Sequence, residues 1–152
     1  MESRGEKTNL ALVLLPAILR GRKVSRGVCT VQETLDAFID VQPVVNIEEY
    51  LKSIDGQQRT QPFVMARGSK LKPSQTCVII ERHAIETPSL LAAVDLAYKT
   101  TFVFDVEYQQ HCRQVWIFLQ SVVYGIGDEG PNITVTPKVH DLRAFLDTKD
   151  II

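Results

Sequence analysis

Two aspartates lie in apolar surroundings where a charged side chain is unexpected. Asp40 stands in the sequence FIDVQ and Asp105 stands in FVFDVEY. Carboxylates at strand ends can hold two metal ions for phosphodiester cleavage, so the pair raises the hypothesis of a metal-dependent nuclease. The pattern lacks the third acidic ligand and the series of strands that would frame such a site. A buried aspartate bonded to the backbone or to an arginine is the commoner explanation.

Three histidines and three cysteines are the other residues that could bind a metal or act as nucleophiles: His83, His111, His140, Cys29, Cys77 and Cys112. None of them shows the close paired spacing of zinc ligands. We therefore predict no metal, no cofactor and no catalytic residue. Cys77 is interpreted as a small buried hydrophobe, whereas Cys112, near a predicted helix start, could have a lowered pKa. The odd number of cysteines favours a reducing compartment.

The sequence GIGDEG at residues 125–130 formally matches the GxGxxG dinucleotide pattern. That pattern binds pyrophosphate only when it follows a strand and opens a helix, and here it follows a predicted helix. Asp128 and Glu129 would also repel phosphate. The segment is interpreted as the end of a helix and a loop.

Four cations occur in a short segment and could contact phosphate: Arg20, Arg22, Lys23 and Arg26. They support one alternative function, a nucleic-acid-binding accessory domain that uses residues 20–26. Few aromatic residues are interleaved with the cations, as stacking on single strands would require. The formal net charge of -1 argues against nucleic-acid binding over the whole surface. A solvated charged linker is the simpler interpretation.

The composition is that of one ordinary globular domain. The chain has 152 residues, of which 45% are hydrophobic and 23% charged, and a chain of this length folds without a metal or disulfide. We expect a single domain at 9–147, a disordered N-terminus at 1–8 and a C-terminal tail at 148–152. The apolar run 10–19 is too short to cross a bilayer and lacks a cleavage site. This predicts a soluble intracellular protein, cytoplasmic or nuclear, with no membrane contact.

Helices make up most of the predicted elements. Asn9 is expected to cap a helix over 10–19, where apolar residues occupy nearly every position, which predicts burial on most sides. Asn46 is expected to cap a short helix over 47–54, with Gly56 beyond its end. Residues 30–36 are expected to form a helical turn. Longer apolar helices are predicted from Ser89 to about residue 106 and over 115–126, followed by a short amphipathic helix over 138–146.

Strands are predicted over 37–41, 62–66 and 76–84 from their β-branched and aromatic residues. The last two, joined by a turn-rich segment, are expected to pair as a hairpin. The fold class is therefore α+β, with a small three-stranded, largely antiparallel sheet packed against long apolar helices. The core is expected within 88–126, whose aromatic residues are interpreted as packing, and its polar break at 107–113 is expected to reach the surface.

Several short segments together carry a resemblance: residues 14–16 (LLP), 38–41 (FIDV), 61–64 (QPFV), Asp95 with Lys99, 107–108 (EY) and 116–120 (WIFLQ). The chain resembles a poorly characterised metazoan domain, found mainly in arthropod and fish proteins, that is associated with mobile elements and with the C-terminal region of some sterile-alpha-motif proteins. Gln109 stands where that domain often has proline. The resemblance implies a non-enzymatic accessory or interaction domain, with no catalytic residues.

The apolar core and the lack of a catalytic set favour a non-enzymatic protein-interaction or assembly domain, and the resemblance adds derivation from a mobile element. Its partner would be another protein or a second copy of the chain, because a net charge near zero leaves self-association electrostatically unopposed. Asp105, Glu107, Tyr108 and Trp116 are predicted to have interaction or structural roles. Nucleic-acid binding and the metal-dependent nuclease are kept as alternatives.

Overall fold

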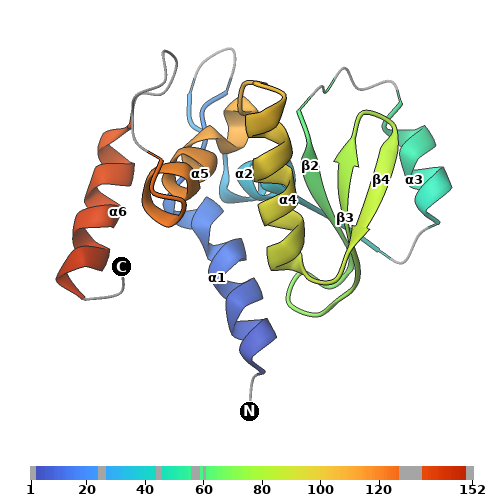
Figure 1. The fold of residues 1–152 in the computed structure, drawn as a ribbon, viewed down its shortest axis with the longest axis horizontal. Helices are drawn as coiled ribbons and strands as arrows, with labels where there is room; N and C mark the ends of the chain where they lie inside the picture. The colour runs from blue at the N-terminus through green and yellow to red at the C-terminus, as the bar shows by residue number, and fades with distance from the viewer. Residues whose placement is uncertain are drawn as a thin grey trace.

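A mixed four-stranded sheet with helices on both faces forms the centre of the protein (Figure 1). The computed structural model describes residues 3–23, 27–43, 46–55, 59, 61–126 and 135–149. The predicted α+β class is confirmed, but the sheet has four strands instead of three, and it is mixed, with one parallel and two antiparallel pairings. Within the described part of the chain, no helix has both the length and the apolar character needed to cross a membrane.

The strands follow the chain in the order β1-β2-β3-β4. β1 (Ile39–Gln42) runs parallel to β2 (Phe63–Gly68), which pairs with β3 (Pro73–Ile80) in the predicted antiparallel hairpin. β3 in turn pairs with β4 (His83–Thr87). The sequence predicts one strand over 76–84, a range that includes the start of β4. The turn between β3 and β4 places Glu81 in the left-handed region at φ 54°. Glutamate rarely adopts that conformation, so no turn signal marked the break.

The larger part of the core lies between one face of the sheet and the helices packed on that side. α4 (Leu90–Val103) packs on β2 and β3, where Val64 and Val78 are fully buried. The helix α2 (Val31–Phe38) continues directly into β1. Phe38, the last residue of α2, packs edge-on against the indole of Trp116, with ring centroids 5.1 Å apart. Trp116 is therefore buried packing, as predicted.

Among the described residues, α3 (Ile47–Ser53) is the helix that covers the opposite face of the sheet. Tyr50 of this helix packs in a small second cluster that includes Phe63, Met65 and Cys77 from the strands. The predicted cap is confirmed, because the side chain of Asn46 accepts a hydrogen bond from the backbone N–H of Glu48 at 2.8 Å. The sheet is thus a layer between two cores of unequal size.

The helices of segment 88–126 are shorter than the sequence predicted. α4 is followed by a turn in which Asp105 has a positive φ of 51°, and then by a 3-10 turn, η1 (Gln110–Cys112). After it, α5 (Arg113–Phe118) passes into a π-helical turn, η2 (Leu119–Val123). The expectation of long apolar helices is wrong because this left-handed turn and the change of helix type divide the apolar run into short pieces.

The first and last helices begin or end outside their predicted bounds. α1 (Arg4–Ile18) includes residues that were expected to be disordered, and Asn9 lies inside it. The cap is Ser3, whose hydroxyl accepts from Glu6 N at 3.2 Å while the Glu6 carboxylate accepts from Ser3 N at 2.8 Å. α6 (Pro137–Thr148) confirms the predicted C-terminal helix and extends two residues further, into the predicted tail.

Candidate functional site

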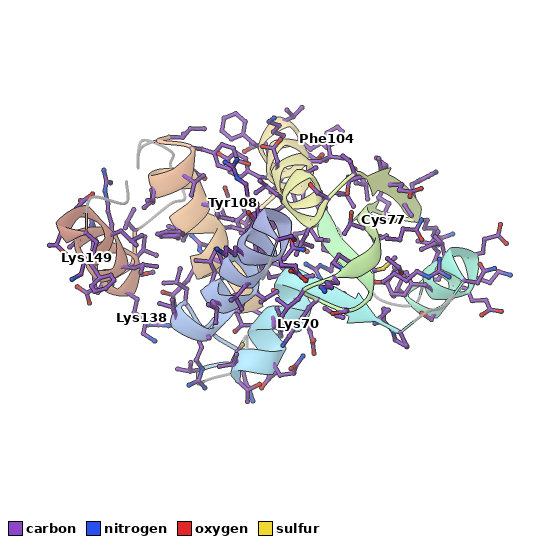
Figure 2. The ribbon with its side chains drawn as sticks, turned by 90° about the horizontal axis from the view of Figure 1, so that it is seen from below. Lys70, Cys77, Phe104, Tyr108, Lys138 and Lys149 are labelled. Atoms are coloured by element: carbon purple, nitrogen blue, oxygen red, sulfur yellow. The ribbon has the colours of Figure 1, made fainter. Side chains whose placement is uncertain are left out.

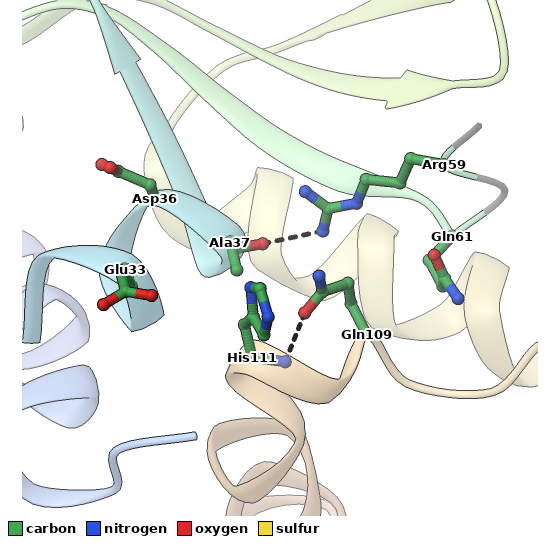
Figure 3. Close-up of a pocket in the computed structure, with 7 residues that line it drawn as sticks. All are labelled: Glu33, Asp36, Ala37, Arg59, Gln61, Gln109 and His111. Carbon is green, nitrogen blue, oxygen red and sulfur yellow. Dashed lines mark hydrogen bonds between the residues drawn. The ribbon is translucent and has the colours of Figure 1, made fainter. Parts of the chain in front are cut away.

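A cavity of about 530 Å³ opens between α2, the segment that precedes β2, and η1 (Figure 3). One lining residue is apolar and the other six are polar: Ala37, Glu33, Asp36, Arg59, Gln61, Gln109 and His111. Gln109 and His111 belong to the polar break at 107–113, so the break opens on this cavity. The sequence had suggested His111 as a candidate metal ligand and had predicted that the break reaches the surface, but it had not indicated the lining residues from α2 or those before β2.

Arg59 is held on the cavity wall by two contacts. Its Nη2 donates a hydrogen bond to the carbonyl of Ala37 at 2.7 Å, and its Cζ lies 4.2 Å from the centroid of the Phe63 ring. The side chain is largely buried, and burial lowers the pKa of the guanidinium. Its buried Nε has no hydrogen-bond partner among the described residues. Arg59 therefore supplies a cation that two contacts fix on the cavity wall.

The opposite wall is the first two turns of α2. Thr30 caps the helix, since its hydroxyl accepts from Glu33 N at 3.1 Å and the Glu33 carboxylate accepts from Thr30 N at 3.2 Å. This bond from the Thr30 backbone, helped by its hydroxyl and by Lys23, lowers the pKa of Glu33. Asp36 is exposed and accepts from the Gln32 side chain at 2.6 Å. Two carboxylates thus stand on this wall.

The third wall is η1, which the chain segment after α1 holds in place. The side-chain oxygen of Gln109 accepts from His111 N at 2.5 Å, which fixes the start of the turn (Figure 3). A Cβ added to Gly21 would lie 1.7 Å from the carbonyl oxygen of His111, so only glycine fits there. The backbone N–H of Gly21 is buried and donates to the Thr34 hydroxyl at 2.9 Å.

The predicted basic segment runs beside this cavity as folded chain. Arg20 donates through Nε to the carbonyl of Cys29 at 2.7 Å, and Lys23 forms an ion pair with Glu33 at 3.7 Å. The backbone of Arg22 forms an isolated bridge with Val28, and its side chain is exposed. Arg26 lies outside the described residues. The interpretation as a solvated linker is therefore wrong for Arg20, whereas Arg22 and Lys23 are exposed, and nucleic-acid contact stays a prediction.

The two aspartates of the nuclease hypothesis lie on different elements. Asp40, on β1, accepts hydrogen bonds from the Tyr50 hydroxyl at 2.6 Å and from the Gln42 amide at 2.7 Å. Burial, and then the bond to Asp40, raise the pKa of Tyr50. Asp105 is an exposed residue of the turn after α4. Among the described residues, no three or more His, Cys, Asp and Glu side chains are grouped so that they could hold a metal.

The three cysteines are buried and free. Cys77 lies inside the sheet, as predicted (Figure 2). Burial raises the pKa of the Cys112 thiol to about 12, so the prediction that its pKa could be lowered is wrong. The helix start near Cys112 does not offset the cost of removing a thiolate from water. In the glycine-rich segment, Gly125 adopts φ 64°, and residues 127–130 lie outside the described residues.

The residues predicted for interaction or structure divide into two kinds. Tyr108 stacks on Trp116 with ring centroids 6.1 Å apart, and its hydroxyl donates to the buried Gln120 side chain at 2.5 Å. These contacts give Tyr108 and Trp116 a structural role. Asp105 and Glu107 are exposed. Phe104, next to Asp105 in the chain, is 65% exposed at the edge of the molecule, so the interpretation of the aromatic residues in 88–126 as packing is wrong for it (Figure 2).

A second surface feature is the outer side of α1. Three large apolar residues at four-residue intervals are exposed there, Leu10 by 37%, Leu14 by 49% and Ile18 by 51%, and Ala11 and Ala17 beside them are also exposed. The inner side of the helix is buried through Leu12, Val13, Pro16 and Leu19. The prediction that α1 is buried on most sides is therefore wrong, because the fold covers one side only.

No protein-family model matches this sequence, and comparison with curated proteins and with solved structures gives no match either. The contacts of the chain's own residues are therefore the basis for assigning it a function.

Proposed function

We propose that this chain is a non-enzymatic interaction domain that self-associates through the outer face of α1. The observation that supports this is the exposed row of Leu10, Leu14 and Ile18. Side chains four residues apart are neighbours on a helix surface, so the three form one continuous stripe. A helix that is apolar on all sides is normally buried, and contiguous exposed apolar side chains mark interaction surfaces. The stripe would be covered in an assembly.

A second copy of the chain is the partner that this face fits. In an antiparallel pair of α1 helices with a two-fold axis at Leu14, Leu10 of one copy faces Ile18 of the other, and Ala11 faces Ala17. The order of large and small side chains is the same from both ends, as a two-fold interface requires. The alanines allow close approach of the helix axes. The net charge of -1 adds little repulsion between copies.

Sedimentation velocity on the purified chain, from low to high micromolar concentration, tests this proposal. We expect a reversible dimer, and we expect Leu14→Glu to weaken it by at least about a hundredfold in Kd, since two like charges would meet at the axis. The matched control is Leu91→Glu, which changes a leucine of α4 that is 52% exposed. Circular dichroism checks that both variants are folded.

Two results would contradict the proposal. One is a wild-type chain that stays monomeric up to high micromolar concentration. The other is equal behaviour of the two variants, whether both dissociate or both remain dimeric, because association would then not depend on the α1 face.

A further inference from the structure

We propose that the cavity lined by Arg59 binds a small zwitterion, whose carboxylate contacts the Arg59 guanidinium and whose cationic group faces the carboxylates of α2. This binding site is separate from the α1 face and does not depend on self-association. The inference follows from the charges on the two walls and from the contacts that those charges already have.

The first step is the cation. Buried charges in proteins are normally paired, because an unpaired charge removed from water is costly. None of the ion pairs among the described residues includes Arg59. Asp40 is close enough to interact electrostatically with Arg59. However, the two carboxylate oxygens of Asp40 already accept hydrogen bonds from Tyr50 and Gln42. Arg59 thus carries a largely buried charge that no ion pair among the described residues neutralises, and a carboxylate that met the part of the guanidinium lining the cavity would neutralise it.

The second step is the anionic wall. Glu33 and Asp36 line the same cavity as Arg59, and neither forms an ion pair with it. Glu33 has Lys23 as a partner, whereas the hydrogen-bond partner of Asp36 among the described residues is the neutral amide of Gln32. A ligand that carried an anion alone would meet repulsion from this wall. A ligand with one charge of each sign complements both walls at once.

The third step is the rest of the lining. Gln61, Gln109 and His111 contribute amide and imidazole groups, and Ala37 is the one apolar lining residue. A cavity of about 530 Å³ is within the range of small-molecule sites. Because six of the seven lining residues are polar, charge and hydrogen bonding can provide the recognition, which favours a compact polar ligand over a hydrophobic one.

Titrations followed by ¹H–¹⁵N correlation spectra test the site, with the Arg59 Nε–H and the Gln61 and Gln109 amides as local reporters. The probes are glycine, β-alanine, γ-aminobutyrate and ε-aminocaproate, which carry the same two charges at increasing separation. Acetate and ethylamine carry one charge each. We expect one member of the series to bind about tenfold more tightly than acetate or ethylamine, and to shift the Arg59 resonance.

Variants separate the two walls. Asp36→Asn keeps an acceptor for Gln32 and removes only the charge, so it should reduce the affinity for the best zwitterion about tenfold and leave acetate binding no weaker. Arg59→Gln should abolish both. The control is Asp141→Asn, which changes an exposed carboxylate of α6.

Three results would overturn the proposal, and none of them requires Arg59→Gln to fold. The first is the absence of a saturable shift with every zwitterion at tens of millimolar. The second is a series in which no member binds better than the singly charged probes. The third is an unchanged affinity in Asp36→Asn, or an equal loss in Asp141→Asn.

Discussion

The outer face of α1 and the cavity beside α2 are unlike surfaces on neighbouring helices. The α1 face is a row of apolar side chains on a convex helix, whereas the cavity is a concave site lined by charged and amide groups. Removing an apolar row from water is favourable with many partners. Polar groups in an open cavity bind water, so a ligand must replace each of those hydrogen bonds to bind there. The α1 face would therefore select its partner by shape complementarity, and the cavity would select its ligand by charge and hydrogen bonding.

Gly21 joins these two regions, and its substitution should have the largest effect on stability. A Cβ at this position would meet the His111 carbonyl, so Gly21→Ala must displace η1 from the end of α1. We expect a loss of more than about 3 kcal/mol in the free energy of unfolding. Urea denaturation at one low protein concentration measures it.

Gly5→Ala is the matched control for Gly21→Ala. A Cβ on Gly5 in the first turn of α1 would have its nearest neighbour, the Ser3 hydroxyl, 3.9 Å away. Alanine has the higher helix propensity, so this change should be neutral or stabilising by up to about 1 kcal/mol. Equal stability of Gly21→Ala and the wild-type chain would show that the contact between α1 and the cavity wall is looser than described.

The two sides of α1 should respond differently to the same truncation. Leu12→Ala removes a buried side chain and should cost about 2 to 3 kcal/mol. Leu14→Ala, on the exposed side, should cost less than about 1 kcal/mol in a dilute, monomeric sample. Thermal unfolding of both variants at several concentrations gives the comparison, because dimer formation makes stability concentration-dependent. Similar losses in dilute samples would mean that Leu14 is already covered within one chain.

Acid should weaken the cavity wall through Glu33, with a smaller effect. Its pKa is lowered in the folded chain, chiefly by the Thr30 N–H, so the unfolded chain binds the proton more readily. The stabilisation is present above the usual glutamate pKa and is lost as pH falls through the folded value. The difference in urea midpoint between neutral pH and pH about 3 should therefore be smaller in Glu33→Gln than in the wild-type chain. An unchanged difference would contradict this.

Local features of the fold could be predicted from sequence, and features that depend on packing could not. The Asn46 cap and the β2–β3 hairpin follow from neighbouring residues and are confirmed. The break before β4 was missed because Glu81 carries no turn signal. The apolar character of α1 was evident, but the number of sides covered depends on how many elements pack against the helix.

The cavity was beyond prediction for a related reason. Glu33, Arg59 and Gln109 are ordinary polar residues far apart in the chain, and only the packing of α2, η1 and the segment before β2 brings them together. The burial of Arg59 and the unpaired state of its Nε among the described residues indicate a special position, but only the three-dimensional structure shows them. From the sequence, Gly21 is likewise an ordinary glycine of a connecting segment. Its need for glycine follows only from the His111 backbone, which packs against it in the fold.

The parallel pairing of β1 with β2 has a consequence for how the chain folds. β2, β3 and β4 are joined by short connections and pair with their sequence neighbours, so their ladders close small loops. Ile39 pairs with Val64 across a segment that includes all of α3. Closing that longer loop costs more entropy before any contact is gained. The docking of β1 is accordingly where we expect the kinetic barrier of sheet assembly to lie.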